Sequence, residues 1–457
     1  MAARRRFSVI RDPVHGDVHL SHEEMRVLDT PEMQRLRGVK QLGTAYLVFP
    51  GALHTRFDHS IGSLYMAQAV IDAVNRNFEL DPAGSVAIGE EEARVIRIAA
   101  LVHDVTHVPF GHSIEDQDGI FGRHDLPHRF QGMLGPRTEL GRTLRELGVV
   151  EDVLAVLEAS ERATHVPPYW RQIVGGTLAS DILDYLARDA YFTGLRLAID
   201  PRVTGYLKVD RATQNLYVDL AKHDLLREDI LSEVVRLLEA RYHFSERVYY
   251  HHAKVAAGAL IARAVETALA CGAVKEADFY SETDASVLDL LERSVEKSPR
   301  EARDRVRDLV ARFRARRLPK RACVYPRYEN AAHQESLVAR YFAPGGAQAR
   351  AELEARIADL ARFATGRAVD VIVYCPARSM QLKEAGMHVR WPGVPGVAPL
   401  SQHASRVPRL GDLETSYRNL WKFYVFAEAP ADALPKIAEI AAAELAPAVN
   451  AYKPRAE

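Results

Sequence analysis

The sequence predicts a predominantly α-helical protein with a small α+β lobe near its C-terminus. Through most of the chain, apolar residues recur every three or four positions, which is the spacing of amphipathic helices. After about residue 366 the spacing changes, and residues 369–374 show the period of two that is typical of a strand. The chain has 457 residues, of which 47% are hydrophobic and 26% charged, so a sizeable core can be buried.

We expect three segments along the chain. Residues 1–270 are predicted to form a helical body, residues 271–365 a helical extension, and residues 366–457 the α+β lobe. The elements expected in the lobe are strands at residues 369–374, 387–391 and 420–426 and a helix over residues 431–445.

The body begins with short elements that glycine and proline separate. Ser21 followed by Glu24 has the pattern of a capping box, which predicts a short helix towards Leu28. Pro31 begins a second short helix, because proline is favoured in the first helical turn. Residues 42–49 are expected to form a loop or a short extended piece.

Two longer helices then carry polar residues at their ends. The first begins at about His59, and apolar residues follow it with helical spacing. The second begins with glutamates at residues 90–92, whose charges suit the positive end of the helix dipole. This second helix ends on the dipeptide His103-Asp104, so a rigid element presents two ligand-type side chains.

Two further helices present polar side chains on defined faces. Residues 177–191 predict a helix on which Asp181 and Tyr185 share one face. Residues 225–270 predict one long helix or two abutting ones. On that segment Arg241 and Tyr249 are eight residues apart, about 80° in projection, so both can face one cavity. Arg188 lies on the same face as Asp181 and Tyr185 in the helix predicted at residues 177–191.

Charge and cysteine content limit the class of protein. The formal net charge is −1, so any affinity for phosphates or nucleic acid must be local. The three cysteines are widely spaced and form no Cys-x-x-Cys motif, which fits a reducing cytoplasm and argues against a thiolate metal site. We identify no signal peptide and no membrane span. The basic run at residues 312–321 could contact nucleic acid, but interleaved acids just upstream favour a solvated helix face.

Two histidines and two aspartates suggest a site for one divalent metal ion: His59, His103, Asp104 and Asp181. Imidazole and carboxylate ligands suit Mn, Fe, Zn, Ni and Mg alike, so the residue types do not select the metal. A His-Asp dipeptide on its own is common by chance, and Asp58-His59 at a helix start is often only a cap. Density strengthens the metal interpretation, since seven of the 18 histidines lie between residues 54 and 128.

The order of these four residues resembles the HD superfamily of metal-dependent phosphohydrolases. Neighbouring motifs are similar to one branch, the deoxynucleoside triphosphate triphosphohydrolases with SAM and HD domains and the bacterial dGTP triphosphohydrolases. The resemblance covers most of residues 8–265. The motifs that carry it are Asp12-Pro13-Val14-His15-Gly16, Lys40-Gln41-Leu42-Gly43, the run from Phe49 to Gly62 with His54, Arg56 and His59, and Asp184-Tyr185 with Ala187-Arg188-Asp189.

The resemblance implies a role for each matching residue. The four metal ligands are those named above, and an additional Mg ion can accompany the polyphosphate. Arg56, His107 and His112 are expected over the α-phosphate, and His124 with Glu115 is expected to act as general acid or base. Gln41 and Leu42 are expected to read the sugar. The residues expected to line the substrate cavity are Tyr185, Asp189, Arg241 and Tyr249.

The function that the resemblance implies is cleavage of a (deoxy)nucleoside triphosphate at the α-phosphate, giving nucleoside and tripolyphosphate. Ile182 stands where relatives have a phosphate-binding lysine, so a dinucleoside polyphosphate or another ribo- or signalling nucleotide is the alternative substrate. Ser8 and Arg11 depart from the family's regulatory contacts, which leaves a nucleotide-driven tetramer open. A second alternative is a nucleotide- or nucleic-acid-binding sensor with a vestigial site. We expect a cytoplasmic protein that binds no membrane.

Overall fold

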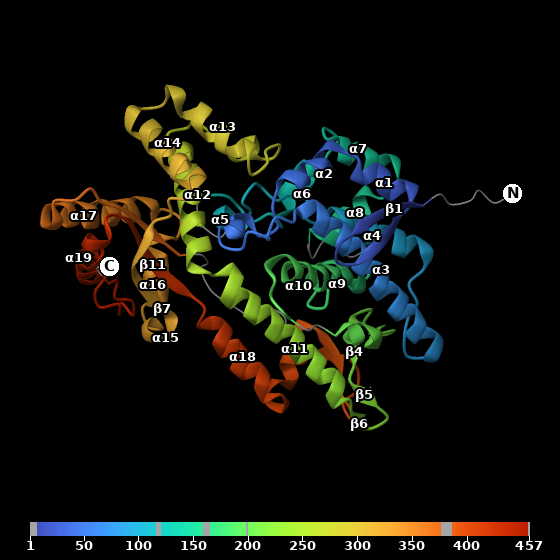
Figure 1. Ribbon diagram of the computed structural model, residues 1–457. Helices are drawn as coiled ribbons and strands as arrows, with labels where there is room; N and C mark the ends of the chain where they lie inside the picture. The colour runs from blue at the N-terminus through green and yellow to red at the C-terminus, as the bar shows by residue number, and fades with distance from the viewer. Residues whose placement is uncertain (1–6, 116–119, 159–164, 198–199, 376–385, 456–457) are drawn as a thin grey trace.

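The computed structural model describes residues 7–115, 120–158, 165–197, 200–375 and 386–455. Helices dominate, and the few sheets are small, so the predicted predominantly α fold is confirmed. Figure 1 shows a helical body on one side and a lobe containing α17, α19 and the strands β7 and β11 on the other. The helices α11 and α12 run between these two parts.

The N-terminal end of the described chain is a β-hairpin that the sequence pattern did not predict. β1 (Ser8–Asp12) pairs antiparallel with β2 (Gly16–Leu20), and the turn between them places Gly16 at a φ of +81°. The expected capping box at Ser21 and Glu24 is confirmed at the start of α1 (His22–Leu28). After α2 (Pro31–Arg35), the expected loop or extended piece is instead partly a 3₁₀ helix, Gly43–Leu47. Its first residue, Gly43, has a φ of +54°, a conformation that glycine adopts readily.

Three helices form the centre of the body. α3 (Arg56–Leu80) packs against both α4 (Glu90–Val102) and α10 (Ser180–Thr193). The predicted end of α10 is confirmed, because Gly194 adopts the left-handed conformation with a φ of +73°. Helices α8 (Val150–Leu157) and α9 (Pro168–Gly175) pack against α4.

The predicted pair of abutting helices is also confirmed. α11 (Glu228–Phe244) leads into one π-helical turn, Ser245–Tyr249, and α12 (His252–Ala270) follows. A π turn has one more residue between hydrogen-bond partners than an α turn, and such turns often occur at functional sites. Tyr249 lies at the end of this turn.

The C-terminal lobe contains a three-stranded antiparallel sheet in the order β7-β11-β8. The strands expected at residues 369–374 and 420–426 are confirmed as β8 (Asp370–Tyr374) and β11 (Lys422–Glu428). The first strand, β7 (Lys320–Pro326), lies in the segment for which only helix was expected. Two helices cover the sheet, α17 (Ala347–Thr365) and α19 (Leu434–Glu444).

A second small sheet links distant parts of the chain. Its strand order is β10-β9-β4-β3, and β9 (His388–Arg390) runs parallel to β4 (Leu216–Asp219). β9 confirms the strand expected at residues 387–391, and its partner comes from the body. The division of the chain at residues 270 and 365 stays a prediction. The outer strands are β3 (Leu207–Val209) and β10 (Ala398–Pro399).

The other described elements are short or peripheral. Among the described residues, no helix combines the length and apolar composition that crossing a membrane requires. The remaining α-helices are α5 (His112–Glu115), α6 (Pro127–Met133), α7 (Glu139–Glu146), α13 (Ser286–Ser294), α14 (Arg300–Arg314), α15 (Arg327–Asn330), α16 (Gln334–Tyr341) and α18 (Pro408–Arg418), and the remaining strands are β5 (Ala221–Lys222) and β6 (Leu225–Leu226).

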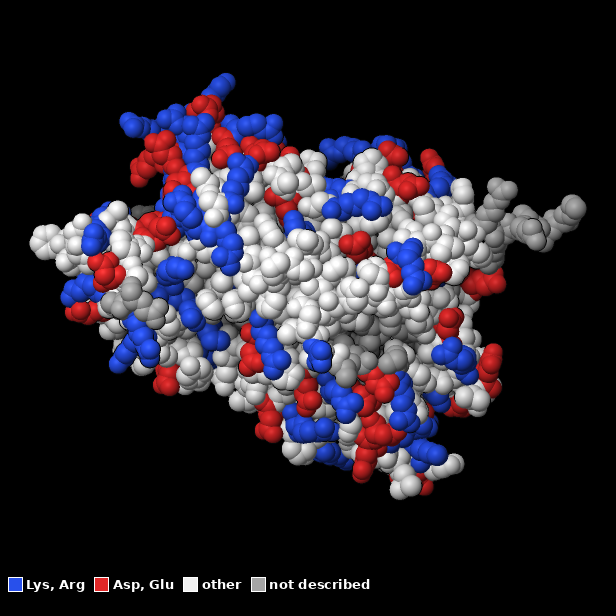
Figure 2. Space-filling model, in the orientation of Figure 1, with Lys and Arg blue, Asp and Glu red and all other residues white. Residues whose placement is uncertain are grey.

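The basic run at residues 312–321 takes part in structural pairing. Arg312 is buried and its Nη1 lies 2.7 Å from Asp370 Oδ2, while Arg316 Nε donates to the Leu47 carbonyl at 2.8 Å. Arg314 Nη1 pairs with Glu292 at 2.7 Å. Figure 2 shows basic and acidic side chains interspersed over the region of α13 and α14, as expected of a solvated helix face.

Removing the cap of α3 should destabilise the protein slightly. Thr55 Oγ1 accepts a hydrogen bond from the Asp58 amide at 3.3 Å, and the Asp58 carboxylate accepts one from the Thr55 amide at 2.8 Å. We expect Thr55→Ala to cost about 1 kcal/mol, since it removes the side chain that caps the helix. Thr55→Ser keeps the hydroxyl and should stay close to wild type. Thermal unfolding of the two variants checks this, and equal midpoints would contradict the prediction.

Candidate metal centre and substrate cavity

The four predicted metal ligands meet at three helix ends. His59 lies in the first turns of α3, His103 and Asp104 directly follow α4, and Asp181 lies in the first turn of α10. His59 Nε2 is 3.1 Å from Asp181 Oδ1 and 3.8 Å from Asp104 Oδ2. His103 Nε2 is 3.6 Å from Asp104 Oδ1 and 3.8 Å from Asp181 Oδ1.

The arrangement fits a divalent ion. His103 Nδ1 lies 2.8 Å from the Ala100 carbonyl oxygen, so Nδ1 donates a proton there and Nε2 is the atom that a metal ion would bind. That Nε2 is buried and has no hydrogen-bond partner among the described residues. A lone pair facing two carboxylates is unfavourable without a positive charge between them, and a bound cation would supply that charge.

The charges at the centre favour ionised carboxylates. Burial raises the pKa of Asp104, but the Arg56 guanidinium and His107 outweigh burial and hold this pKa well below its usual value. Burial lowers the pKa of His59, but hydrogen bonds to Asp181 and Asp184 outweigh burial and raise it to about 10. A divalent ion would therefore replace a proton on His59, as metal ions commonly do at histidine ligands.

A second group of histidines adjoins the ligands. His107 Nε2 is 3.2 Å from Asp104 Oδ1, and its ring stacks on that of His124 with centroids 3.6 Å apart. The ring of His112 completes the group, with centroids 5.3 Å from His107 and 5.4 Å from His124. Burial and the charge of Arg56 hold the pKa of His107 well below its usual value, so His107 is neutral. The structure therefore brings these three predicted histidines together beside Asp104.

Glu115 and Arg56 organise this group. Glu115 is buried and its Oε2 accepts a hydrogen bond from His124 Nδ1 at 2.9 Å. Burial raises the pKa of Glu115, but His107 and His124 outweigh burial and lower it, so the carboxylate is ionised. Arg56 Nη1 donates to Asp104 Oδ2 at 2.5 Å. One guanidinium thus contacts a predicted metal ligand at the edge of the histidine group.

The predicted cavity residues form a connected network beside the metal centre. Asp189 Oδ2 accepts a hydrogen bond from the Tyr249 hydroxyl at 2.7 Å. The ring of Tyr185 lies edge-on to His59 with centroids 6.5 Å apart, which joins the network to the ligands. Burial opposes the charge of Arg241, but Tyr185, Tyr417 and Tyr249 more than offset it and raise the Arg241 pKa.

Gln41 and Leu42 lie at the same network. Asp189 Oδ1 bonds His54 Nε2 at 2.8 Å, and the His54 carbonyl accepts from the Gln41 amide at 3.1 Å. The side-chain oxygen of Gln41 is buried and accepts no hydrogen bond from a described residue, so it could accept one from a bound ligand. The next residue, Leu42, is also buried, with 6% of its surface exposed.

Sequence reasoning missed some residues of this site. Tyr417, on α18, is far away in sequence and approaches Arg241 only through the tertiary fold. Asp184 and His15 belong to motifs that the sequence singled out, yet no role followed from them. The helical spacing from Asp181 to Asp184 was the available signal for Asp184. Ile182, the position that departs from the family, packs in the main hydrophobic core and is 7% exposed.

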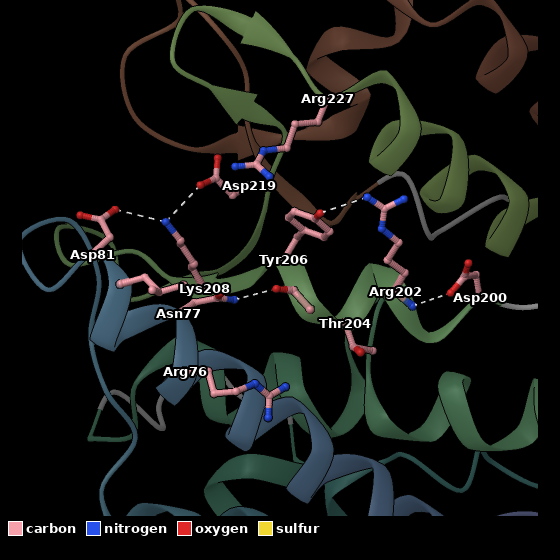
Figure 3. Close-up of a pocket in the computed structure, with 12 residues that line it drawn as sticks. Arg76, Asn77, Asp81, Asp200, Arg202, Thr204, Tyr206, Lys208, Asp219 and Arg227 are labelled. Atoms are coloured by element: carbon pink, nitrogen blue, oxygen red, sulfur yellow. Dashed lines mark hydrogen bonds and ion pairs between the residues drawn. The ribbon is translucent and has the colours of Figure 1, made fainter.

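A separate cavity contains none of the predicted site residues. It has a volume of about 820 Å³ and lies between the end of α3, the 3₁₀ segment Pro201–Tyr206, β3 and β4. Figure 3 shows Lys208 between Asp81 and Asp219, each at 3.1 Å. Two carboxylates therefore neutralise this lysine.

Two family models match the chain. The HD domain model matches residues 56–185, which contain all four predicted metal ligands. The HD associated region model matches residues 219–447, which is half of the chain.

Curated relatives match about half of the chain. The uncharacterized protein MJ1154 of Methanocaldococcus jannaschii is 30% identical over 262 residues, 56% of this chain and 49% of that protein. The uncharacterized protein YwfO of Bacillus subtilis is 32% identical over 250 residues, 53% and 52% of the two chains. The deoxynucleoside triphosphate triphosphohydrolase SAMHD1 of Danio rerio is 29% identical over 274 residues, 53% of this chain and 42% of that protein. The chain thus spans about half the length of these relatives.

A solved structure shares the whole fold. The crystal structure of a hypothetical protein from Aquifex aeolicus covers 96% of this chain and is itself covered completely, with a TM-score of 0.65. The two sequences are 22% identical, so this likeness concerns the fold alone.

Adding a side chain at Gly62 should disrupt the centre. A Cβ on Gly62 would lie 1.9 Å from Asp184 Oδ1 and 2.3 Å from Arg188 Nη2. We expect Gly62→Ala to lower the free energy of unfolding by about 1–3 kcal/mol and to reduce bound metal, since overpacking displaces both side chains. Thermal unfolding and elemental analysis measure the two effects.

The matched control is Gly132→Ala on α6. Gly132 is exposed, and a Cβ there meets no described atom within 4 Å. This substitution should leave metal content unchanged and stability equal or slightly higher, because alanine favours a helix more than glycine. A Gly62→Ala protein that behaves like this control would contradict the packing argument.

Proposed function

Because this chain belongs to the family that joins an HD domain to an HD associated region, whose HD domains are those of phosphohydrolases, we propose that it is a metal-dependent nucleotide phosphohydrolase. The observation that carries the proposal is the buried Nε2 atom of His103, which faces two carboxylates beside a group of histidines. The ionised carboxylates of this site would repel an anion. With a bound cation between them, the same residues suit a phosphate.

We propose that His59, His103, Asp104 and Asp181 hold one divalent ion. Such an ion would act as a Lewis acid on a phosphate oxygen. Arg56, which already contacts Asp104 at 2.5 Å, would place its positive charge beside the same phosphate. The residue types leave Mn, Fe, Zn, Ni and Mg open, and a further Mg ion can accompany the polyphosphate.

The proposed proton donor is His124. Its Nδ1 is fixed by Glu115 at 2.9 Å, which leaves Nε2 for a substrate. A histidine whose Nδ1 is held by a carboxylate is oriented so that its Nε2 can give a proton to a leaving oxygen. The neighbouring His107 is neutral and can accept or donate a hydrogen bond without adding repulsion. His112 is assigned to the same phosphate.

The proposed substrate is a (deoxy)nucleoside triphosphate. Water would attack the α-phosphorus, the bond between that phosphorus and the nucleoside oxygen would break, and nucleoside and tripolyphosphate would leave. The grouping of Tyr185, Asp189, Arg241 and Tyr249 supports this assignment, because a guanidinium among tyrosines suits the terminal phosphates of a nucleotide. Gln41, whose side-chain oxygen bonds no described residue, would accept from the sugar.

A dinucleoside polyphosphate or a ribo- or signalling nucleotide is the alternative substrate. The observation that favours it is Ile182, which is buried in the core and offers no cation next to Asp181. A sensor with a vestigial site remains the rival from another class. We also propose a cytoplasmic location, which the low cysteine content supports, and a homo-oligomer whose dependence on nucleotide is open.

A nucleotide panel tests the proposal. The purified protein is incubated with Mn²⁺ or Mg²⁺ and each deoxynucleoside triphosphate, ribonucleotide and dinucleoside polyphosphate, and products are separated by chromatography. We expect tripolyphosphate from deoxynucleoside triphosphates and none from His103→Ala, which should also lose its metal. Absence of tripolyphosphate with every triphosphate would reject the primary assignment, and nucleotide binding without any turnover would favour the sensor.

His124→Ala separates proton transfer from metal binding. We expect kcat to fall by about 10²–10⁴-fold, the usual contribution of a general acid, while metal content stays at the wild-type level. His128→Ala, an exposed histidine on α6, is the control and should retain full activity. Steady-state kinetics with elemental analysis on the same samples checks this. Unchanged kcat in His124→Ala would remove this residue from the mechanism.

A further inference from the structure

We infer that the N-terminal hairpin is part of the metal centre, because His15 acts through Asp184 to position the ligand His59. This inference rests on the metal site of the proposed function. It gives a role to the motif Asp12–Gly16, which lies more than 40 residues before the first ligand in the sequence and acts on the ligand through Asp184.

The Asp184 carboxylate receives four hydrogen bonds and has no room for another arrangement. Its Oδ2 lies 2.7 Å from His59 Nδ1 and 2.9 Å from Arg188 Nε. Its Oδ1 lies 2.6 Å from His15 Nε2 and 2.9 Å from Arg188 Nη2. The side chains of His59, Asp184 and Arg188 are fully buried, and that of His15 is 9% exposed. Arg188 thus holds both carboxylate oxygens, and His59 and His15 each add one hydrogen bond to a different oxygen.

The carboxylate in turn fixes the state of His59. A carboxylate accepts hydrogen bonds, so His59 Nδ1 must carry a proton where it faces Asp184. When a metal is bound, the lone pair is then on Nε2, the atom that lies 3.1 Å from Asp181. Partners of this kind orient a metal-bound imidazole, and their removal commonly weakens metal binding 10–100-fold.

The hairpin turn is built to hold His15 at this place. Asp12 Oδ1 accepts hydrogen bonds from the amides of Val14 at 2.9 Å and His15 at 2.8 Å, which closes the turn. Asp12 Oδ2 binds Arg188 Nη1 at 2.8 Å, so the turn and Asp184 share one guanidinium. The His15 ring stacks on Tyr65 of α3, with centroids 4.7 Å apart and planes 18° from parallel.

The absence of a side chain at Gly62 lets these groups approach. Asp184 Oδ1 and Arg188 Nη2 both occupy the space that a Cβ on Gly62 would take. Because Oδ1 is the atom that His15 contacts, loss of the imidazole would remove the shorter of its two hydrogen bonds and leave Arg188 Nη2 as its remaining donor. Asp184 could then turn about its side-chain bonds, and His59 would lose its fixed direction.

The experiment measures the affinity for Mn²⁺ by competition with a fluorescent chelator, alongside the unfolding temperature of the metal-free protein. We expect His15→Ala to weaken Mn²⁺ binding about 10-fold and Asp184→Asn about 100-fold. His15→Gln, whose amide can still donate to Asp184, should recover part of the loss. His19→Ala is the matched control, because His19 is an exposed histidine on the same hairpin.

The outcomes separate positioning from plain stability. If His15→Ala lowers only the unfolding temperature and leaves the Mn²⁺ affinity at the His19→Ala level, the inference is wrong. If His15→Ala does not fold, a full-affinity His15→Gln protein supports the inference, and a His15→Gln protein as weak as Asp184→Asn overturns it. Wild-type protein that binds no Mn²⁺ overturns the inference and the proposed function together. Wild-type protein that binds Mn²⁺ without nucleotide turnover overturns the function alone.

Discussion

The buried pair of Asp184 and Arg188 is the constraint on which the body of the protein depends. A carboxylate and a guanidinium without solvent are costly unless every lone pair and N–H has a partner. Here the partners come from α3, from α10 and from the N-terminal hairpin, and each arrives at 2.6–2.9 Å. Burial raises the pKa of Asp184, but Arg188 outweighs burial and holds it far below its usual value. The charge is therefore permanent, and three separate segments are held in one geometry.

That geometry places two kinds of chemistry next to each other. On one side, the histidines and aspartates converge on a point that needs a cation. On the other side, Glu115 orients His124, and burial with the charge of Arg56 keeps His107 neutral at the edge of the same point. Asp104 belongs to both, since it lies 3.2 Å from His107 Nε2 and 3.8 Å from His59 Nε2. A phosphate bound here would meet positive charge, a proton donor and hydrogen-bond donors together.

Local chemistry was predictable from the sequence, and long-range pairing was not. The cap at Ser21, the stop at Gly194 and the strand at residues 369–374 follow from interactions within one or two turns of chain, and all are confirmed. The ligand cluster followed from residue types and order. By contrast, β4 has four fully buried residues and no alternation, so its partner β9, about 170 residues away, gave no local signal. His15 was hidden for the same reason, because its contact with Asp184 spans 169 positions.

The π turn between α11 and α12 limits the insertions and deletions that the protein can tolerate. Each residue of a π turn rotates the chain about the helix axis by a smaller angle than a residue of an α turn does. The π turn therefore brings Tyr249 nearer to the side of the helix that carries Arg241 than a regular α-helix would. Deleting one residue within Ser245–Tyr249 would restore a regular helix and rotate everything after it. Insertions and deletions in surface loops are usually neutral. In this one turn, a single deletion would move Tyr249 away from Arg241, although both side chains would still be present in the protein.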